Sequence, residues 1–386
     1  MKLVIMMKYF DFAASCPLSK EAAEAYLKAS TEYYGNSNSL HDIGNQAQIL
    51  LENCRQQWSK LIGVSSDGIY FTSGGSESNF LGIQSLLSSS HKKGKHIISG
   101  LAEHSSIIGN LRKLEREGYE ITLLKMNDKG VVDISELKRA IRKDTVLISI
   151  QHGNSEIGTV QPLKEIHALT KEHNILLHSD CVHTFGKMDI KEISQLVDSL
   201  SISGHKFYGP KGIGILYLSP KIAWKPFYHG VSHEKGMRPG TVNVPAIVAM
   251  TVAAKAIEEK REAHQLHYRK LHETLIQSLK KLKSDICIYN FEEDVQLPST
   301  IGMRAKGIEG QWMMLEANRK GFAISTGSAC HVGMLTPSNT MVALGVKDKE
   351  AKEFFRVSFG IETTIEEVKS LANAIIEIIQ SYNKVL

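Results

Sequence analysis

The sequence is poor in cysteine, has no long hydrophobic run and lacks paired cysteine motifs. Its five cysteines are widely spaced, and no two of them form a CxxC pair. A disulfide scaffold or a zinc ribbon is therefore not expected, and unpaired thiols favour a reducing compartment. No stretch approaches the roughly 18 apolar residues of a membrane span. The opening MKLVIMMKYF is too short for a secretory signal, so we expect a cytoplasmic protein.

The sequence also lacks a large excess of charge of either sign. The 46 Lys and Arg residues are balanced by 41 Asp and Glu residues, which leaves a formal charge of +5 over 386 residues. This mild excess gives no reason to expect binding to nucleic acid or to an anionic membrane. The content of 42% hydrophobic and 23% charged residues is typical of a folded globular protein.

Helix-like and strand-like segments alternate between about residues 45 and 220. Short apolar runs such as IYFTSG, KHIISG, TVLISI, ILLHSD and DSLSISG are separated by segments with helical spacing. This alternation predicts an α/β fold with a mostly parallel sheet between helices. After about residue 245, one long helical stretch over 246–283 precedes short strands and helices, which predicts a smaller α+β domain. We place the large domain at 15–255 and the small domain at 1–14 and 256–386.

Polar residues cluster where the predicted strands end. The segments are FTSGGSES, AEHSSI, QHGNSEIG, HSDCVH and SGHKFYG. In an open parallel sheet, ligands bind beyond the carboxyl ends of the strands. These five segments therefore define the candidate site.

Two charged residues in these segments have a specific chemical use. Lys206 follows a buried strand, and a desolvated lysine there can form a Schiff base, although SGHK alone is more typical of a surface loop. Asp180 ends the strand ILLHSD. Its carboxylate can pair with a protonated heterocycle nitrogen, as pyridoxal phosphate requires, or can cap a helix.

The other segments offer phosphate donors and an aromatic ring. Gly75 and Ser76 open a predicted helix, where N–H groups and a hydroxyl can bind a phosphate or simply cap the helix. Ser203 and His205 flank the lysine and can add donors. His104 can stack on an aromatic ring or serve as a structural histidine.

The segment H-x-D-C-x-H contains residue types that can bind a metal ion. Its members are His178, Asp180, Cys181 and His183. Because side chains alternate along a strand, 178 and 180 share one face while 181 points away. No second cluster completes a tetrahedral set, so no metal is expected.

The ordered set of motifs is far more specific than any one of them. YFDFAAS, FTSGGSESN, AEHSSI, HGNSEIGTVQP, HSDCVHTFGK, SGHKFYGPKGIG, RPGT, STGSAC and RVSFG span nearly the whole chain. In their order and spacing, the sequence resembles the NifS/IscS-like cysteine desulfurases, fold-type I pyridoxal-phosphate enzymes of the class V aminotransferase group. The resemblance implies a large domain with a mostly parallel, seven-stranded sheet. It also implies pyridoxal 5'-phosphate as cofactor and conversion of L-cysteine to L-alanine and an enzyme-bound persulfide.

The resemblance also implies a role for each matching residue. Lys206 would hold the cofactor and later move the substrate Cα proton, Asp180 would pair with the pyridinium nitrogen, and His104 would stack on the ring. The residues expected at the phosphate are Gly75, Ser76, Ser203, His205 and Thr241. Thr241, in RPGT, would reach the cofactor of a neighbouring subunit, which implies a homodimer.

The substrate would be held and attacked by three further residues. Asn154 and Arg356 would bind L-cysteine, and arginine suits this role because its planar fork binds a carboxylate bidentately. Cys330, in STGSAC, would attack the substrate sulfur as a thiolate and carry it as a persulfide. A mobile loop would then present the sulfur to a protein acceptor, such as an iron–sulfur scaffold or a client enzyme.

The chain departs from the family pattern at two positions near the site. His183 stands where the family usually has Gln, and it would face the 3′-oxygen of the cofactor, with a charge that depends on pH. Cys16 stands where Thr is common, and a packing role is expected for it.

Two alternative functions remain open from the sequence. One is a selenocysteine lyase or another small-amino-acid enzyme of the same fold, which the effect of Cys330→Ala on persulfide formation would distinguish. The other is a non-catalytic, partner-binding homologue, which would bind the cofactor without turning over cysteine.

Overall fold

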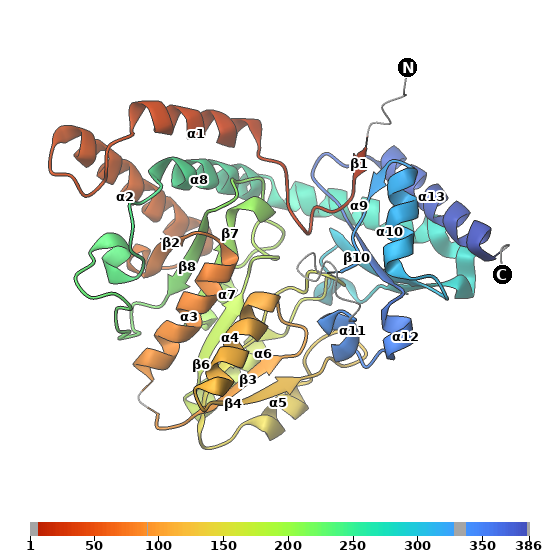
Figure 1. Cartoon of the computed structure of the whole chain (residues 1–386), viewed down its shortest axis with the longest axis horizontal. Helices are drawn as coiled ribbons and strands as arrows, with labels where there is room; N and C mark the ends of the chain where they lie inside the picture. Colours follow the sequence, from red (N-terminus) through yellow and green to blue (C-terminus); the bar gives the residue numbers. More distant parts are fainter. Residues whose placement is uncertain (1–6, 91, 328–336, 384–386) are drawn as a thin grey trace.

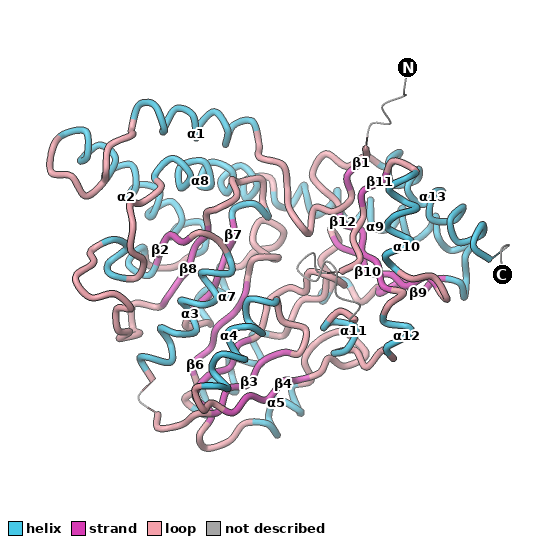
Figure 2. The backbone as a smooth tube through the Cα atoms, viewed as in Figure 1, coloured by secondary structure: helices cyan, strands magenta, loops and turns pink. Residues whose placement is uncertain are grey.

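The computed structural model describes residues 7–90, 92–327 and 337–383, and in these ranges seven strands form a central sheet (Figures 1 and 2). The order across the sheet is β2-β8-β7-β6-β5-β3-β4. The strands are β2 (Ile69–Thr72), β3 (His96–Gly100), β4 (Glu120–Leu124), β5 (Thr145–Ser149), β6 (Leu176–Asp180), β7 (Ser199–Ser203) and β8 (Gly214–Leu218). β8 is antiparallel to both of its neighbours, and the other pairings are parallel.

The strands of the central sheet are continuous runs of apolar or small residues because apolar layers cover both faces of the sheet. Every residue of β3, β5, β7 and β8 is buried, whereas β4 at the edge is partly exposed. Neighbouring residues point into opposite layers, as Ile97 and Ile98 do. The expected α/β fold with a mostly parallel sheet is confirmed.

Helices supply both layers. They are α1 (Lys20–Glu32), α2 (Asp42–Ile62), α3 (Gly75–Ser89), α4 (Ser105–Arg116), α5 (Ile134–Ala140), α6 (Leu163–His173), α7 (Lys191–Leu196) and α8 (Val244–Glu259). α3 and α4 bring residues such as Ile83 and Leu111 to one layer. α2 and α8 bring Trp58 and Ile247 to the other, where Trp58 packs against Phe185 and Phe207.

The C-terminal third builds a second apolar core around a three-stranded antiparallel sheet. Its strands are β9 (Ile286–Tyr289), β10 (Thr300–Ala305) and β12 (Phe354–Ser358), in the order β12-β10-β9. The helices are α9 (Arg261–Leu279), α10 (Gly310–Arg319), α11 (Asn339–Ala343), α12 (Asp348–Ala351) and α13 (Ile365–Asn383). The N-terminal strand β1 (Lys8–Tyr9) pairs with β11 (Phe322–Ala323), so the start of the described chain lies beside the C-terminal third (Figure 1).

The expected single helix over 246–283 is two helices in the structure. The helix is interrupted at Lys260, whose backbone angles (φ −111°, ψ 12°) lie outside the helical region. α8 packs on α1 and α2, whereas α9 packs on α13, so the break lies where the chain passes from one core to the other. Helical spacing continues through the break, which is why the sequence predicted one helix. The division into 15–255 and 1–14 with 256–386 remains our proposal.

Short 3₁₀ turns complete the regular structure. They span Ser66–Gly68, Gly204–Lys206, His233–Gly236, Lys280–Asp285 and Glu293–Val295. No helix within the described ranges has both the length and the apolar character needed to cross a membrane.

Candidate active site

A cavity of about 530 Å³ opens where β2, β3, β5, β6 and β7 end, because parallel strands bring their carboxyl ends to one edge of the sheet. Residues from all five predicted strand-end segments line it, together with residues from the N-terminal segment and from β12. The predicted site residues among its lining are Gly75, Ser76, His104, Asp180, His183, Ser203, His205, Lys206 and Arg356.

Lys206 is placed by the 3₁₀ turn that follows β7. Its Nζ donates to the carbonyl oxygens of Ala13 (2.6 Å) and Ala14 (2.9 Å). Burial, together with the positive charges of Arg356 and Lys187, lowers the pKa of the Lys206 amine from 10.5 to about 8. A lysine with this pKa has a larger unprotonated fraction at neutral pH than a surface lysine, and the unprotonated amine is the nucleophilic form.

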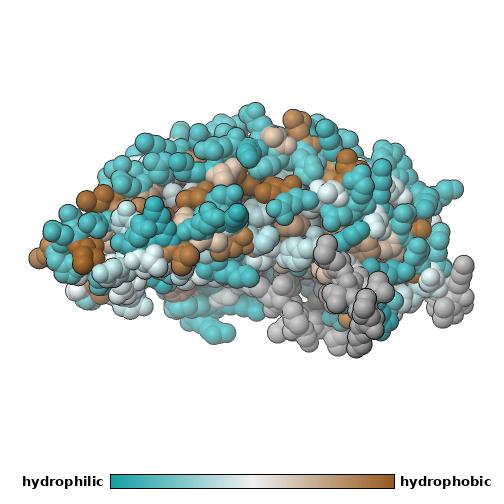
Figure 3. Space-filling view, turned by 90° about the horizontal axis from the view of Figure 1, so that it is seen from above, coloured by the Kyte–Doolittle hydropathy of each residue, from teal (hydrophilic) through white to brown (hydrophobic). Residues whose placement is uncertain are grey.

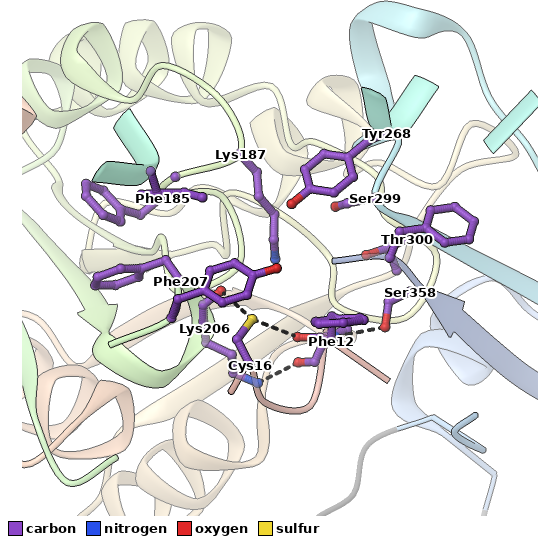
Figure 4. Close-up of a pocket in the computed structure, with 15 residues that line it drawn as sticks. Phe12, Cys16, Phe185, Lys187, Lys206, Phe207, Tyr268, Ser299, Thr300 and Ser358 are labelled. Atoms are coloured by element: carbon purple, nitrogen blue, oxygen red, sulfur yellow. Dashed lines mark hydrogen bonds between the residues drawn. The ribbon is translucent and has the colours of Figure 1, made fainter. Parts of the chain in front are cut away.

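A small pocket lies behind Lys206 and contains a second lysine and a thiol (Figure 4). Cys16 Sγ donates to the carbonyl oxygen of Lys206 at 3.3 Å. Burial raises the pKa of the Cys16 thiol, so the thiol is neutral and packs against its neighbours. Lys187 points into the same pocket, and burial lowers the pKa of its amine to about 8.

Asp180, at the end of β6, is fixed by two donors. Its Oδ1 accepts from the Val182 N–H at 2.9 Å, and its Oδ2 accepts from Asn79 Nδ2 at 2.7 Å. Hydrogen bonds of this kind stabilise the ionised carboxylate. Asp180 can therefore present a negative charge to a protonated ring nitrogen in the cavity.

Asn79 is a site residue that the sequence reasoning missed. It lies one turn after Gly75 on α3, is almost fully buried, and also bonds Ser106 Oγ (3.0 Å). Its Oδ1 accepts from His178 Nε2 at 3.1 Å. Burial lowers the pKa of His178 to about 4, so this histidine is a neutral support behind the carboxylate. The signal in the sequence was the Asn that ends FTSGGSESN.

The turn between β2 and α3 is built from glycines. Gly74 has φ +148° and ψ −177°, a conformation that side chains rarely adopt. A Cβ on Gly75 would lie 2.7 Å from Val182 Cγ2, and a Cβ on Gly214 would lie 2.6 Å from the Gly74 Cα. No side chain in the described part of the chain caps α3, so the N–H groups of its first turn can bind an anion in the cavity.

Two histidines, His183 and His104, also line the cavity. Nε2 of His183 is buried and has no hydrogen-bond partner among the described residues. Burial and the charges of Lys187 and Lys206 lower the pKa of His183 well below its ordinary value of 6.5, so the ring is neutral. His104 caps α4, with Nδ1 accepting from the Ser106 N–H at 3.2 Å.

His205, which the sequence predicts at the cofactor phosphate, lines the cavity next to Lys206. Its Nδ1 lies 3.2 Å from Ser15 Oγ, and burial lowers its pKa to about 4. A neutral imidazole there can donate a hydrogen bond without adding charge.

Arg356 comes from the middle of β12 and reaches the cavity from the C-terminal third. Its Nη1 donates to the Ser155 carbonyl oxygen at 2.9 Å, and its Nη2 donates to Asp11 Oδ1 at 2.6 Å. The side chain is 3% exposed. A buried guanidinium at the wall of the cavity can bind the carboxylate of an amino acid.

Two predicted residues, Asn154 and Thr241, lie outside the cavity lining. Asn154 is buried and is not among the residues that line the cavity. Its Oδ1 accepts from the N–H groups of Glu156 and Ile157, and its Nδ2 donates to Thr340 Oγ1. Thr241 lines an adjoining cavity of about 260 Å³. Cys330 falls outside the described residues.

The residues present fit pyridoxal phosphate. The cavity offers an amine of lowered pKa for the aldehyde, an anchored carboxylate for the ring nitrogen and an uncapped helix start for the phosphate. It also contains a buried ring nitrogen, His183 Nε2, that has no partner in the ranges that the structure describes and can donate a hydrogen bond to a ligand.

Comparison with known proteins agrees with this reading. The family model for class V aminotransferases matches residues 8–371. A NifS protein of Bacillus subtilis is 43% identical over 366 residues, which cover 95% of this chain and 93% of the relative. The cysteine desulfurase IscS of Dictyoglomus turgidum is 38% identical and covers 96% of this chain and 94% of its own. A solved structure of a NifS-like protein superposes with a TM-score of 0.89 at 31% identity, over 97% of this chain and 100% of that one.

The family and the cofactor expected from the sequence are thus confirmed. The chain belongs to the class V aminotransferase family of pyridoxal-phosphate enzymes, within its NifS/IscS branch.

Proposed function

We propose that this protein is a cysteine desulfurase that converts L-cysteine to L-alanine and carries the sulfur as a persulfide on Cys330. The observation that carries the proposal is the meeting of a lysine amine, an anchored carboxylate and a buried guanidinium in one cavity. Relatives that share 37–43% of the sequence bear cysteine desulfurase or NifS names.

The cofactor would be held by the residues that line the cavity. Lys206 would bind its aldehyde carbon, Asp180 its ring nitrogen, and the start of α3 with Ser76, Ser203 and His205 its phosphate. When bound, pyridoxal phosphate supplies an electron sink that weakens the Cα–H and Cβ–S bonds of an attached amino acid.

Lys206 is suited to move the substrate proton. With a pKa of about 8, the amine can take up a proton near neutral pH and release it again. The carbonyl oxygens of Ala13 and Ala14 hold Nζ at the cavity wall. Arg356 would bind the substrate carboxylate, which orients the amino acid relative to that amine.

The sulfur step needs a thiolate outside the described residues. The Cys330 thiolate would attack the substrate sulfur, forming an S–S bond as the Cβ–S bond breaks. The electron pair of the broken bond stays with the substrate carbon, which takes up a proton and leaves as L-alanine. The persulfide sulfur then passes to a thiol or another nucleophile of an acceptor protein, in iron–sulfur cluster assembly or another sulfur pathway.

A homodimer is part of the proposal. Exposed apolar side chains lie on α1, on α2 and in their connection, including Leu27, Tyr34, Leu40 and Ile49. Figure 3 looks down from the α1 side and shows hydrophobic residues among hydrophilic ones at that end of the molecule. A second copy of the chain could cover this surface, and a dimer is what the expected reach of Thr241 to the cofactor of a neighbouring subunit requires. Light scattering should give twice the chain mass. We also infer a cytoplasmic location, because the four cysteines among the described residues are free thiols.

Cys330→Ala tests the function directly. The variant should keep its visible cofactor absorbance but form no alkylatable persulfide, and L-alanine release from L-cysteine should fall by more than about 100-fold. Cys287→Ala is the matched control, because Cys287 is an exposed thiol on β9, outside the cavity lining. Unchanged alanine release in Cys330→Ala would refute the nucleophile, and a wild-type protein without turnover would favour the non-catalytic alternative.

A further inference from the structure

The N-terminal segment 9–15 connects the two charged groups of the site. The phenol of Tyr9 donates to the carbonyl oxygens of Asp11 (3.0 Å) and Ser15 (2.9 Å), which ties the segment into a turn. One end of the segment bonds Lys206 through Ala13 and Ala14. The other end runs along β12, with Asp11 bridged to Ser358.

Asp11 is the residue of this segment that meets the substrate arginine. Its carboxylate lies 2.6 Å from Arg356 Nη2, and the Arg356 side chain is 3% exposed. No other carboxylate bonds this guanidinium among the described residues. Lys206 and Lys187 both lie near enough to interact with it electrostatically. A buried guanidinium beside two amines needs a negative partner to stay in place.

Arg356 has hydrogen-bonding capacity that its contacts with Ser155 and Asp11 do not use. A guanidinium has five N–H donors, and the contacts with Ser155 and Asp11 fix its plane from two sides. Nε is buried and has no partner among the described residues, although Arg356 lines the cavity. Buried donors in folded proteins are nearly always satisfied, so this one is available to an incoming acceptor.

We propose that Asp11 is a positioning residue for the amino-acid carboxylate: it holds Arg356 Nη2 so that the Nε edge stays open to the substrate. Asp11 is not among the residues that line the cavity, so it acts through Arg356. This inference rests on the proposed function, because it takes the substrate to be an amino acid. It assigns part of substrate affinity to a residue 345 positions away in the sequence.

Two small ligands isolate the carboxylate. L-alanine and ethylamine differ by that group, and neither contains sulfur to be removed. Binding of each to the holoenzyme would be measured by calorimetry for the wild type, Asp11→Ala and Asp11→Asn. We expect Asp11→Ala to weaken L-alanine binding by at least about tenfold, with ethylamine unchanged within about twofold. Asp11→Asn should recover part of the loss, since its amide oxygen can still accept from Nη2. With L-cysteine, KM should rise while kcat stays within about twofold.

Asp144→Ala is the matched control, because it removes an aspartate from an exposed arginine pair with Arg142. Unchanged L-alanine binding in Asp11→Ala would overturn the proposal. Tighter binding would also overturn it, since it would make Asp11 a competitor of the substrate. Equal loss for both ligands, or no recovery in Asp11→Asn, would also overturn it. If the wild-type holoenzyme binds L-alanine no better than ethylamine and releases no alanine from cysteine, the proposed function itself fails.

Discussion

Asn79 makes the strongest prediction about how the cavity is supported. Its amide bonds the Asp180 carboxylate at 2.7 Å, Ser106 Oγ at 3.0 Å and His178 Nε2 at 3.1 Å, and it also accepts from the Ser201 hydroxyl. Asn79→Ala would remove all four contacts. It would leave a buried carboxylate oxygen and a buried ring nitrogen with fewer partners.

The magnitude follows from the types of bond. The contact with the charged carboxylate is worth about 1.5–3 kcal/mol, and each neutral contact about 0.5–1.5 kcal/mol. Because bonds within one network are not additive, we expect the lower half of the sum, a loss of about 3–5 kcal/mol in the free energy of unfolding. Asn110→Ala provides the comparison, since Asn110 is also buried but, within the described ranges, its side chain accepts one neutral hydrogen bond, from Gln84 Nε2 at 3.0 Å. Its expected loss is about 1 kcal/mol.

Urea unfolding of the cofactor-free protein, followed by far-ultraviolet circular dichroism, measures both variants without contribution from the cofactor. Asn79→Ala should be less stable than Asn110→Ala by at least about 2 kcal/mol. A difference below about 1 kcal/mol would refute the view that Asn79 anchors the carboxylate. In that case Asp180 would be held mainly by its bond to the Val182 N–H.

Two further predictions concern buried charge. The folded protein releases the Lys206 proton near pH 8, whereas the unfolded chain keeps it to about pH 10.5, so folding gains stability as pH rises through this interval. In the absence of cofactor, the free energy of unfolding of the wild type, taken relative to that of Lys206→Met, should therefore rise by roughly 2 kcal/mol between pH 7 and 9.5. A difference that stays constant over this range would contradict the lowered pKa of Lys206. Glu234→Ala should cost about 3–5 kcal/mol, because it strands the buried Arg55 guanidinium. Glu52→Ala, which removes the more exposed partner of the same arginine, should cost less than about 1 kcal/mol. Thermal unfolding of both variants measures this difference.

Much of the fold could be predicted because its signals are local. Short apolar runs separated by helical spacing identified the strands of the central sheet, since strands buried on both faces carry continuous apolar or small residues. The error at Lys260 is of the same kind: helical spacing is local, but the break depends on which core each half packs against.

The site was predicted to the extent that its residues follow strands. Lys206, Asp180 and Ser76 each stand at a strand end, so the direction of the sheet brings them together. Asn154 also follows a strand, but its amide serves the loop that contains it. A strand-end position therefore indicates proximity to the cavity and does not decide where a side chain points.

The sequence by itself determined the alternation of strands and helices, the cluster of polar strand ends and the family. Each of these depends on residues close together along the chain or on the order of motifs. The tertiary structure decided the partners that tune the site: Asn79 with Asp180 across 101 residues, Glu234 with Arg55 across 179, and Asp11 with Arg356 across 345. No periodicity or spacing records such pairs, because a buried charge is stabilised by whichever polar or charged group the folded chain brings within hydrogen-bond distance.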